Sequence, residues 1–103
     1  MEIRYSDHLR FKLRVRDIPG QVPERIYRES RQRYDNHHTL RHIAVMQVHY
    51  HRHRTLMMIA YDRRADHVEI VTIHPITKDQ IQERLRTGRW TYEQTDGELR
   101  PRE

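Results

Sequence analysis

The fold of this chain is decided by residues 40–76, which read LRHIAVMQVHYHRHRTLMMIAYDRRADHVEIVTIHPI. This stretch holds 19 of the 36 apolar residues of the chain. They gather in three runs rich in Ile, Val, Met and Tyr, over residues 40–50, 56–61 and 68–73. Short charged breaks between such runs are typical of strands joined as an antiparallel meander. Because both alternate faces of the runs carry apolar residues, we expect either that both faces are largely buried, or that helices cover one face and a ligand or partner the other.

Helices are predicted both before and after this meander in the sequence. A short strand at residues 3–5 precedes a helix over residues 8–16, and a second helix begins at Pro23. After the meander, residues 77–80 read TKDQ, the pattern of a capping box, and Gly88 is well placed to end the third helix. The predicted order is β-α-α-β-β-β-α. This is an α+β domain in which a two-helix hairpin and a C-terminal helix lie beside a small antiparallel meander sheet.

The length and the residue classes limit what the chain is. Its 103 residues make about one domain, and we expect residues 1–90 to form it, followed by a flexible polar tail over residues 91–103. The absence of cysteine excludes a disulfide framework and a thiolate metal site. No apolar run approaches the roughly 20 residues that span a bilayer, and the N-terminus lacks the apolar segment of a signal peptide. We therefore expect a cytoplasmic protein without membrane contact.

Arginine dominates the charge of the chain. There are 20 basic and 15 acidic residues, a formal charge of +5, and 18 of the basic residues are Arg. The planar guanidinium holds phosphate through two parallel hydrogen bonds, and a basic domain of this kind suggests a polyanion as partner. The alternative is that Arg is abundant only because the genome is GC-rich.

Three basic side chains share one face of the first predicted helix. His8, Lys12 and Arg16 follow one another at four-residue spacing, in the middle of the arc that the apolar residues of this helix define. Because burial of unpaired basic groups is costly, these side chains are expected to line a cleft or hold an anion. Two simpler explanations stay open. Their stems cover the core while the charged ends reach water, or they pair with acidic residues, for which the candidates are Glu24, Glu29 and Glu69.

The same residues carry a resemblance to a family. His8-x3-Lys12-x3-Arg16-x-Ile18 resembles an N-terminal pattern of small bacterial proteins of the RelE/ParE-like toxin superfamily, and residues 71–74, VTIH, are similar to its last strand. The order of elements also resembles that of the RelE/ParE-like fold. The resemblance implies a toxin–antitoxin role: RelE-like members are metal-independent ribonucleases that act on mRNA at the ribosome, ParE-like members act on DNA gyrase, and an acidic antitoxin protein commonly neutralises them.

Two histidines are the candidates for acid–base chemistry. Metal-free cleavage of RNA needs a base for the 2′-hydroxyl, an acid for the leaving oxygen and cations for the charged phosphorane. Histidine suits the first two roles because it titrates near neutral pH. We assign these roles to His8 and His74, and phosphate binding to Lys12, Arg16 and Arg89. Alternatively, His74 only caps the end of its strand and His8 is an ordinary residue of a helix N-terminus.

Further basic residues and the single tryptophan come together after the third predicted helix. Arg84, Arg89 and Trp90 are candidate nucleic-acid ligands, since arginine can hold a phosphate while tryptophan stacks on its base. Alternatively, Trp90 fastens the C-terminal segment to the core.

A histidine triplet raises the question of a metal ion. His49, His51 and His53 alternate as ligands on one strand face would. The hairpin turn must fall within the same residues, however, which breaks the alternation. We therefore predict no structural metal at the triplet, while its capacity to bind one stays open.

The sequence lacks the patterns GxxxxGK[ST], GxGxxG, HExxH and GxSxG, and no cofactor is expected. It favours a RelE-like domain that binds RNA or the ribosome, and leaves open whether the domain also cleaves RNA. The alternative is a non-catalytic interaction module of the same fold that binds an acidic protein partner.

Overall fold

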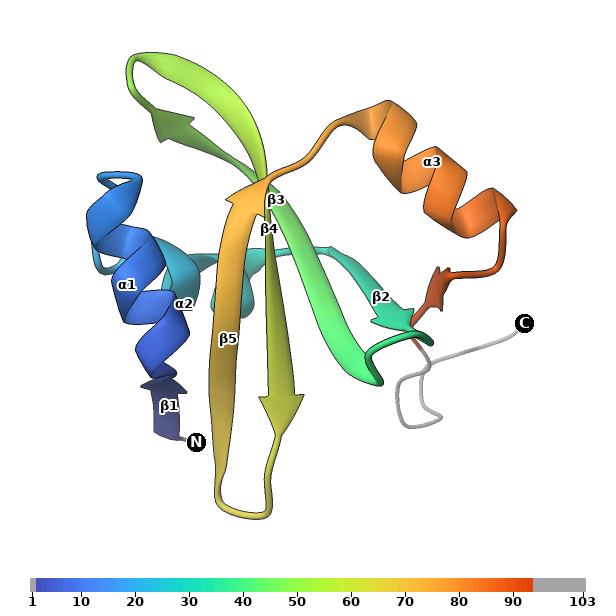
Figure 1. Ribbon diagram of the computed structural model, residues 1–103, viewed down its shortest axis with the longest axis horizontal. Coiled ribbons are helices and arrows are strands. Elements are labelled where there is room, and N and C mark those ends of the chain that lie inside the picture. The colour runs from blue at the N-terminus through green and yellow to red at the C-terminus, as the bar shows by residue number, and fades with distance from the viewer. Residues whose placement is uncertain (1, 94–103) are drawn as a thin grey trace.

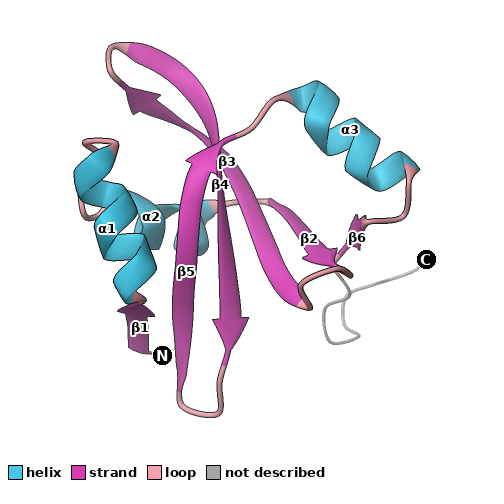
Figure 2. Ribbon diagram, in the orientation of Figure 1, coloured by secondary structure: helices cyan, strands magenta, loops and turns pink. Residues whose placement is uncertain are grey.

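The structure, a computed structural model, describes residues 2–93 and shows an α+β fold built on a six-stranded mixed sheet (Figures 1 and 2). In chain order the elements are β1 (Glu2–Tyr5), α1 (Asp7–Val15), α2 (Val22–Glu29), β2 (Gln32–Asn36), β3 (Arg41–Tyr50), β4 (His53–Arg63), β5 (His67–Pro75), α3 (Lys78–Arg86) and β6 (Trp90–Tyr92). The strand order is β1-β5-β4-β3-β2-β6. β1 runs parallel to β5, and every other neighbouring pair is antiparallel.

This sheet corrects the predicted fold class. The three apolar runs do lie in β3, β4 and β5, but the small antiparallel meander with a two-helix hairpin, implied also by the RelE/ParE-like resemblance, is wrong. Two strands were missed. β2 reads QRYDN, a polar segment in which Asp35-Asn36 suggests a turn, yet it bonds with β3 on one side and β6 on the other. Backbone pairing with β3 and β6 holds this segment extended, and no local pattern in the sequence predicts such pairing.

The helix ends follow from local signals. The Ser6 hydroxyl accepts a hydrogen bond from the Leu9 amide at 3.0 Å and begins α1. Thr77 and Gln80 form both bonds of the predicted capping box, which begins α3. Gly88 has a φ of +79°, the left-handed conformation that ends helices and that glycine adopts at little cost.

The core lies on both faces of the sheet, because successive residues of β4 point to opposite sides. Met57, Ile59 and Tyr61 pack with the buried residues of α1 and α2. Met58 and Ala60 face the other way, in a cluster that includes the α3 residue Ile81 together with Trp90 and Ile76. Two helices, α1 and α2, therefore pack into the core cluster on one face of the sheet, and α3 packs into the cluster on the other face.

The early end of β1 brings α1 beside the second half of β5. β1 pairs with β5 only from His67 to Ile70, and the chain then turns into α1, fastened by the Ser6 hydroxyl, which donates to the Val71 carbonyl at 2.8 Å. Beyond this point α1 runs beside the rest of β5 in place of a strand (Figure 1). The last residues of β5 therefore lie between α1 on one side and β4 on the other, just before the chain leads to α3.

The first residues of the predicted tail belong to the sheet. β6 takes in Thr91 and Tyr92, and the Glu93 amide donates to the Arg33 carbonyl at 3.1 Å. The remainder of that segment, residues 94–103, lies outside the described residues. Across residues 2–93 no helix is long and apolar enough to span a bilayer.

Candidate nucleic-acid interface

His74 lies near the end of β5, opposite Met58 of β4. Its half-buried ring therefore points to the face that α3 covers in part. The Nδ1 atom lies 3.2 Å from the Pro75 carbonyl oxygen. Because a carbonyl only accepts hydrogen bonds, Nδ1 carries the hydrogen, and the neutral ring presents a free lone pair at Nε2.

The surroundings of His74 favour its neutral form. Burial lowers the pKa of His74 below its ordinary value, and the positive charges of Lys12, Arg84 and Arg16 lower it further. The bond to Pro75 opposes this shift without cancelling it. An uncharged imidazole is thus surrounded by three cations, two from the α1 segment and one from α3.

On the α1 side, the cations have no acidic partner. Lys12 is half-buried, and burial together with the charge of Arg16 lowers its pKa. Within residues 2–93 neither side chain forms an ion pair. The carboxylates considered as partners are engaged elsewhere: Glu24 with Arg28 at 2.9 Å, Glu29 with Arg25 at 3.3 Å and Glu69 with Arg64 at 3.6 Å. The expected pairing with these acids is therefore not observed.

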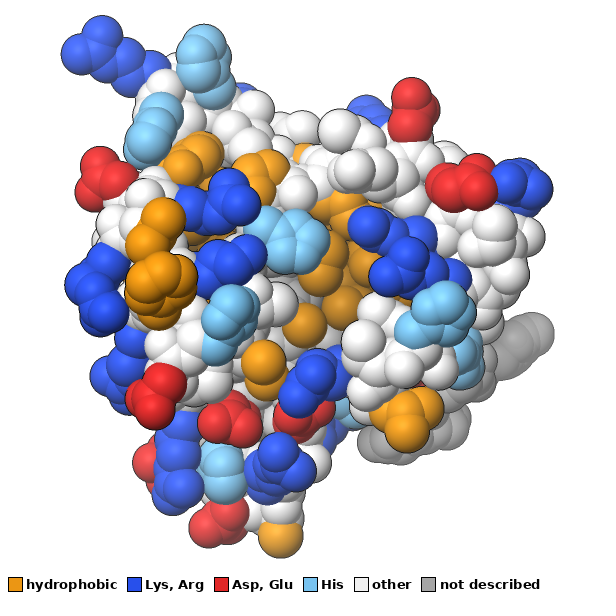
Figure 3. Space-filling model, viewed as in Figure 1, with side chains coloured by type: hydrophobic (Ala, Val, Ile, Leu, Met, Phe, Trp, Pro, Cys, Tyr) orange, Lys and Arg blue, Asp and Glu red, His pale blue; other side chains and the backbone are white. Residues whose placement is uncertain are grey.

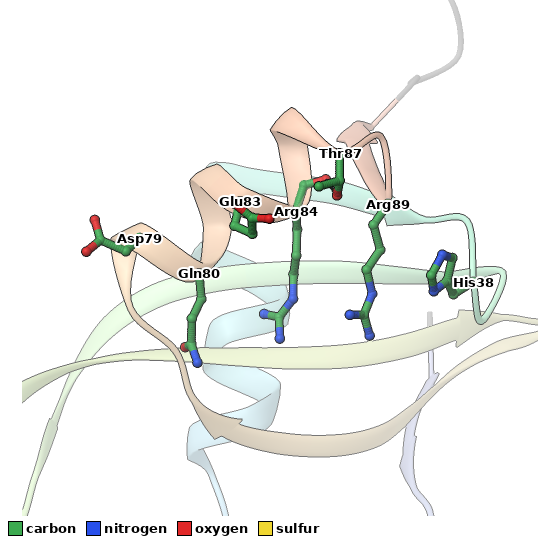
Figure 4. A pocket seen from close by; sticks show the side chains of 7 residues that line it. All are labelled: His38, Asp79, Gln80, Glu83, Arg84, Thr87 and Arg89. Atoms are coloured by element: carbon green, nitrogen blue, oxygen red, sulfur yellow. Dashed lines mark hydrogen bonds between the residues drawn. The ribbon is translucent and has the colours of Figure 1, made fainter.

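On the α3 side, Arg84 and Arg89 extend side by side in the same direction (Figure 4). They line an open pocket of about 650 Å³ together with His38, Gln80 and other α3 residues. Burial and the neighbouring charge of Arg89 lower the pKa of Arg84. Glu83, the nearest acid on the helix, pairs with Arg86 at 2.7 Å instead. The Nη1 atom of Arg84 is buried and has no hydrogen-bond partner among residues 2–93.

Trp90 fastens the C-terminal segment to the core, which is the alternative that the sequence left open. Its side chain is only 2% exposed, which leaves no ring face for a nucleotide base. It stacks on Tyr34, with ring centroids 5.3 Å apart, and the Arg84 guanidinium carbon lies 5.0 Å from its ring centroid. Because β6 pairs with β2, Trp90 lies in the core, where its ring contacts the Arg84 guanidinium.

His8 begins the row that Lys12 and Arg16 continue. It is exposed in the first turn of α1, and eight residues of helix put it about 12 Å along the axis from Arg16. His8 therefore lies on the same side as the cations, at the opposite end of the row from the α1 C-terminus.

Together these groups form one surface, which we call the basic groove: Lys12, Arg16, His74, Arg84 and Arg89. Figure 3 shows basic side chains over α1 and α3 on either side of a hollow in which apolar and histidine side chains are exposed. The sequence singled out each of these five residues, but it could not show that two helices bring them to the end of β5.

The histidine triplet does not share a face. β3 ends at Tyr50 and β4 begins at His53, so His51 lies in the turn. The register pairs His49 with Arg54 and Tyr50 with His53. His49 and His53 therefore point to opposite faces of the hairpin.

A cluster of possible metal ligands was not predicted from the sequence. Ligand atoms of Asp35, His42 and Glu93 lie within 4.8 Å of one another. The Nδ1 atom of His42 is 2.8 Å from Asp35, and Arg63 contacts Glu93 at 3.0 Å. A guanidinium thus already balances Glu93, whose side chain is almost fully buried. The cluster was not foreseen because Asp35 and Glu93 come together only through β2 and β6.

Comparison of the chain with models of protein families, with curated proteins and with solved structures finds no match in any of the three. Membership in the RelE/ParE-like superfamily therefore stays a prediction.

Proposed function

We propose that the basic groove binds RNA and that His74 acts there as the general base of a metal-independent ribonuclease. The observation that carries this proposal is the convergence of Lys12, Arg16 and Arg84 on a neutral imidazole, with no carboxylate bonded to any of the three cations among the described residues.

A bound phosphate accounts for this arrangement. Like charges that lie close together repel, and a partly buried charge loses hydration. Phosphate offsets both costs, because it brings negative charge and accepts several hydrogen bonds at once. Arg84 and Arg89 provide parallel guanidinium groups for this purpose, and one donor of Arg84 has no other partner.

The chemistry of cleavage follows from the state of His74. Nε2 of the neutral ring takes the proton of the ribose 2′-hydroxyl, and the oxygen attacks the adjacent phosphorus. The phosphorus–O5′ bond then breaks, which leaves a 2′,3′-cyclic phosphate and, after protonation, a 5′-hydroxyl. We assign that last proton to His8. Lys12, Arg16 and Arg84 stabilise the negative charge of the phosphorane. DNA lacks the 2′-hydroxyl, so it should bind without being cleaved.

The same groove also supports a second function, the binding of an acidic protein. The observation that favours it is an apolar pair on α1: Phe11 is 54% exposed and Val15 is 65% exposed, one helical turn apart. A partner with acidic and apolar residues would cover this pair and the groove together, as an antitoxin would.

The test is RNA binding and cleavage by chelator-treated protein, compared between two double variants. K12A/R16A removes two charges of the groove, and R25A/R28A removes two charges from α2, where both pair with glutamates. We expect K12A/R16A to reduce the log–log slope of affinity against salt by about one to two units, and R25A/R28A to leave it unchanged.

Two outcomes contradict the proposal. Equal slopes for K12A/R16A and the wild type would remove the α1 cations from the RNA interface. Tight binding of an acidic protein, without measurable RNA affinity, would favour the second function.

A further inference from the structure

The tip of the β3–β4 hairpin is the segment of the chain richest in histidine and arginine together, and it has no role in the groove described above. Residues 49–54 read HYHRHR, so five of six are histidine or arginine, and all five are exposed. Arg54 bonds to the neutral side chain of Gln47 at 3.0 Å. Among residues 2–93, the carboxylate that pairs with the tip is Asp17, 3.9 Å from the His51 ring.

The turn itself is built from unfavourable residues. His51 has a φ of +50° and Arg52 a φ of +70°. Two-residue hairpin turns with positive φ favour Asn-Gly, because other side chains meet steric resistance in this conformation. The chain therefore gives up stability to keep an imidazole and a guanidinium at the tip. Strain of this kind is a reason to look for a function at the residues that bear it.

The hairpin tip adjoins the basic groove. The Tyr50 hydroxyl donates to the Arg16 carbonyl at 2.6 Å, and the His51 ring stacks on Tyr50 with centroids 4.0 Å apart. These contacts fix the tip next to the C-terminal end of α1, where it projects beyond the body of the sheet (Figure 1). Arg16 is thus shared between the end of the groove and the base of the tip.

We propose that the hairpin tip, residues 49–54, extends the basic groove and binds the backbone phosphates of the same RNA strand beyond those at His74. Arg52 and Arg54 supply charge, and the imidazoles donate N–H bonds to phosphate oxygens. This inference rests on the proposed function, because it requires the groove to hold RNA. The occupant is the phosphate backbone, since the tip offers cations and ring donors, which match phosphate oxygens.

The experiment replaces the strained turn by the residues that favour it. H51N/R52G removes one permanent charge and one imidazole, and it should fold with a Tm at least as high as that of the wild type. We expect it to bind a single-stranded RNA more weakly, with a log–log salt slope reduced by about 0.7, the value for one phosphate contact. R52Q keeps His51 in the turn and removes only the charge of Arg52. Its log–log salt slope should fall by the same amount, which shows that the loss comes from the charge and not from the shape of the turn.

A matched control comes from another turn residue with a positive φ. Leu40 has a φ of +62° and lies exposed between β2 and β3. L40G relieves the same kind of strain without removing charge, so it should leave RNA affinity and the salt slope unchanged.

The outcomes separate the two claims. If K12A/R16A weakens RNA binding while H51N/R52G and R52Q bind as the wild type does, the hairpin proposal is overturned and the groove stands. If the wild type binds no RNA, both are overturned. A loss of slope in both hairpin variants, with L40G unchanged, supports the hairpin proposal.

Discussion

Replacement of Arg84 by methionine should weaken RNA binding without destabilising the protein. Arg84 Nη1 is buried without a partner, and an unpaired buried donor costs about 1–3 kcal/mol. The contact of the guanidinium with the Trp90 ring returns about 0.5–2 kcal/mol, and a Met side chain keeps favourable contact with the ring. We therefore expect R84M to range from equal to the wild type to more stable by about 2 kcal/mol.

The assay is urea and thermal unfolding followed by circular dichroism, in a buffer free of phosphate. For a domain of this size, about 1 kcal/mol corresponds to a rise in Tm of about 4–8 °C. The matched control is R86M on the same helix. Arg86 is exposed and pairs with Glu83, so its loss should leave the stability nearly unchanged, because exposed ion pairs contribute little. Only R84M should weaken RNA binding.

The reasoning fails if R84M is less stable than R86M by more than about 1 kcal/mol, the net value of an ordinary hydrogen bond. In that case Arg84 stabilises the core through its contact with Trp90, and its unpaired donor does not indicate an anion-binding site. It also fails if R84M binds RNA as tightly as the wild type.

Three further predictions concern the histidines. Because the pKa of His74 is lowered in the folded chain, the unfolded chain takes up this proton more readily, so stability should fall as pH drops below about 6.5; H74Q should reduce this loss in urea unfolding at pH 5 against pH 7.5, and H38Q, at an exposed position, serves as the comparison. H8A and H74A should each reduce RNA cleavage by about 10²–10⁴-fold, and full activity in both would remove them from the mechanism. A chelator should leave Tm unchanged, since a structural zinc in the hairpin tip would contribute several kcal/mol to folding.

Local signals in the sequence were sufficient for the starts of the helices and for the central strands, but helical spacing that continued to Tyr34 did not show that the second helix ends at Glu29. The capping residues Ser6 and Thr77 and the terminator Gly88 act within a few residues of their own position, and the apolar runs mark strands that are buried on both faces. β2 and β6 depend instead on pairing between segments far apart in the chain. Such pairing leaves no periodic pattern in a polar segment like QRYDN, so the sheet was predicted with too few strands.

The candidate site also depends on pairing between distant segments, which the sequence does not show. Spacing along α1 correctly indicated that His8, Lys12 and Arg16 share one face. It could not indicate that β1 ends early, which lets α1 approach the end of β5 at His74. For Trp90 the neighbouring residues in the sequence left two roles open, base stacking and attachment to the core. Pairing of β6 with β2 buries the ring and so supports attachment.

The central claim is that a phosphate of RNA lies at His74 between the cations of α1 and α3. The most direct test is a pH titration of the His74 Cε1 proton by NMR, with and without a saturating RNA oligonucleotide that carries 2′-deoxyribose so that it cannot be cleaved. In the free protein burial and the cations hold the pKa of His74 below the ordinary histidine value. A phosphate at this position offsets the positive charges, so the account predicts that the bound oligonucleotide raises the pKa and shifts the resonance. An oligonucleotide that binds while the His74 resonance and its pKa stay unchanged would contradict it.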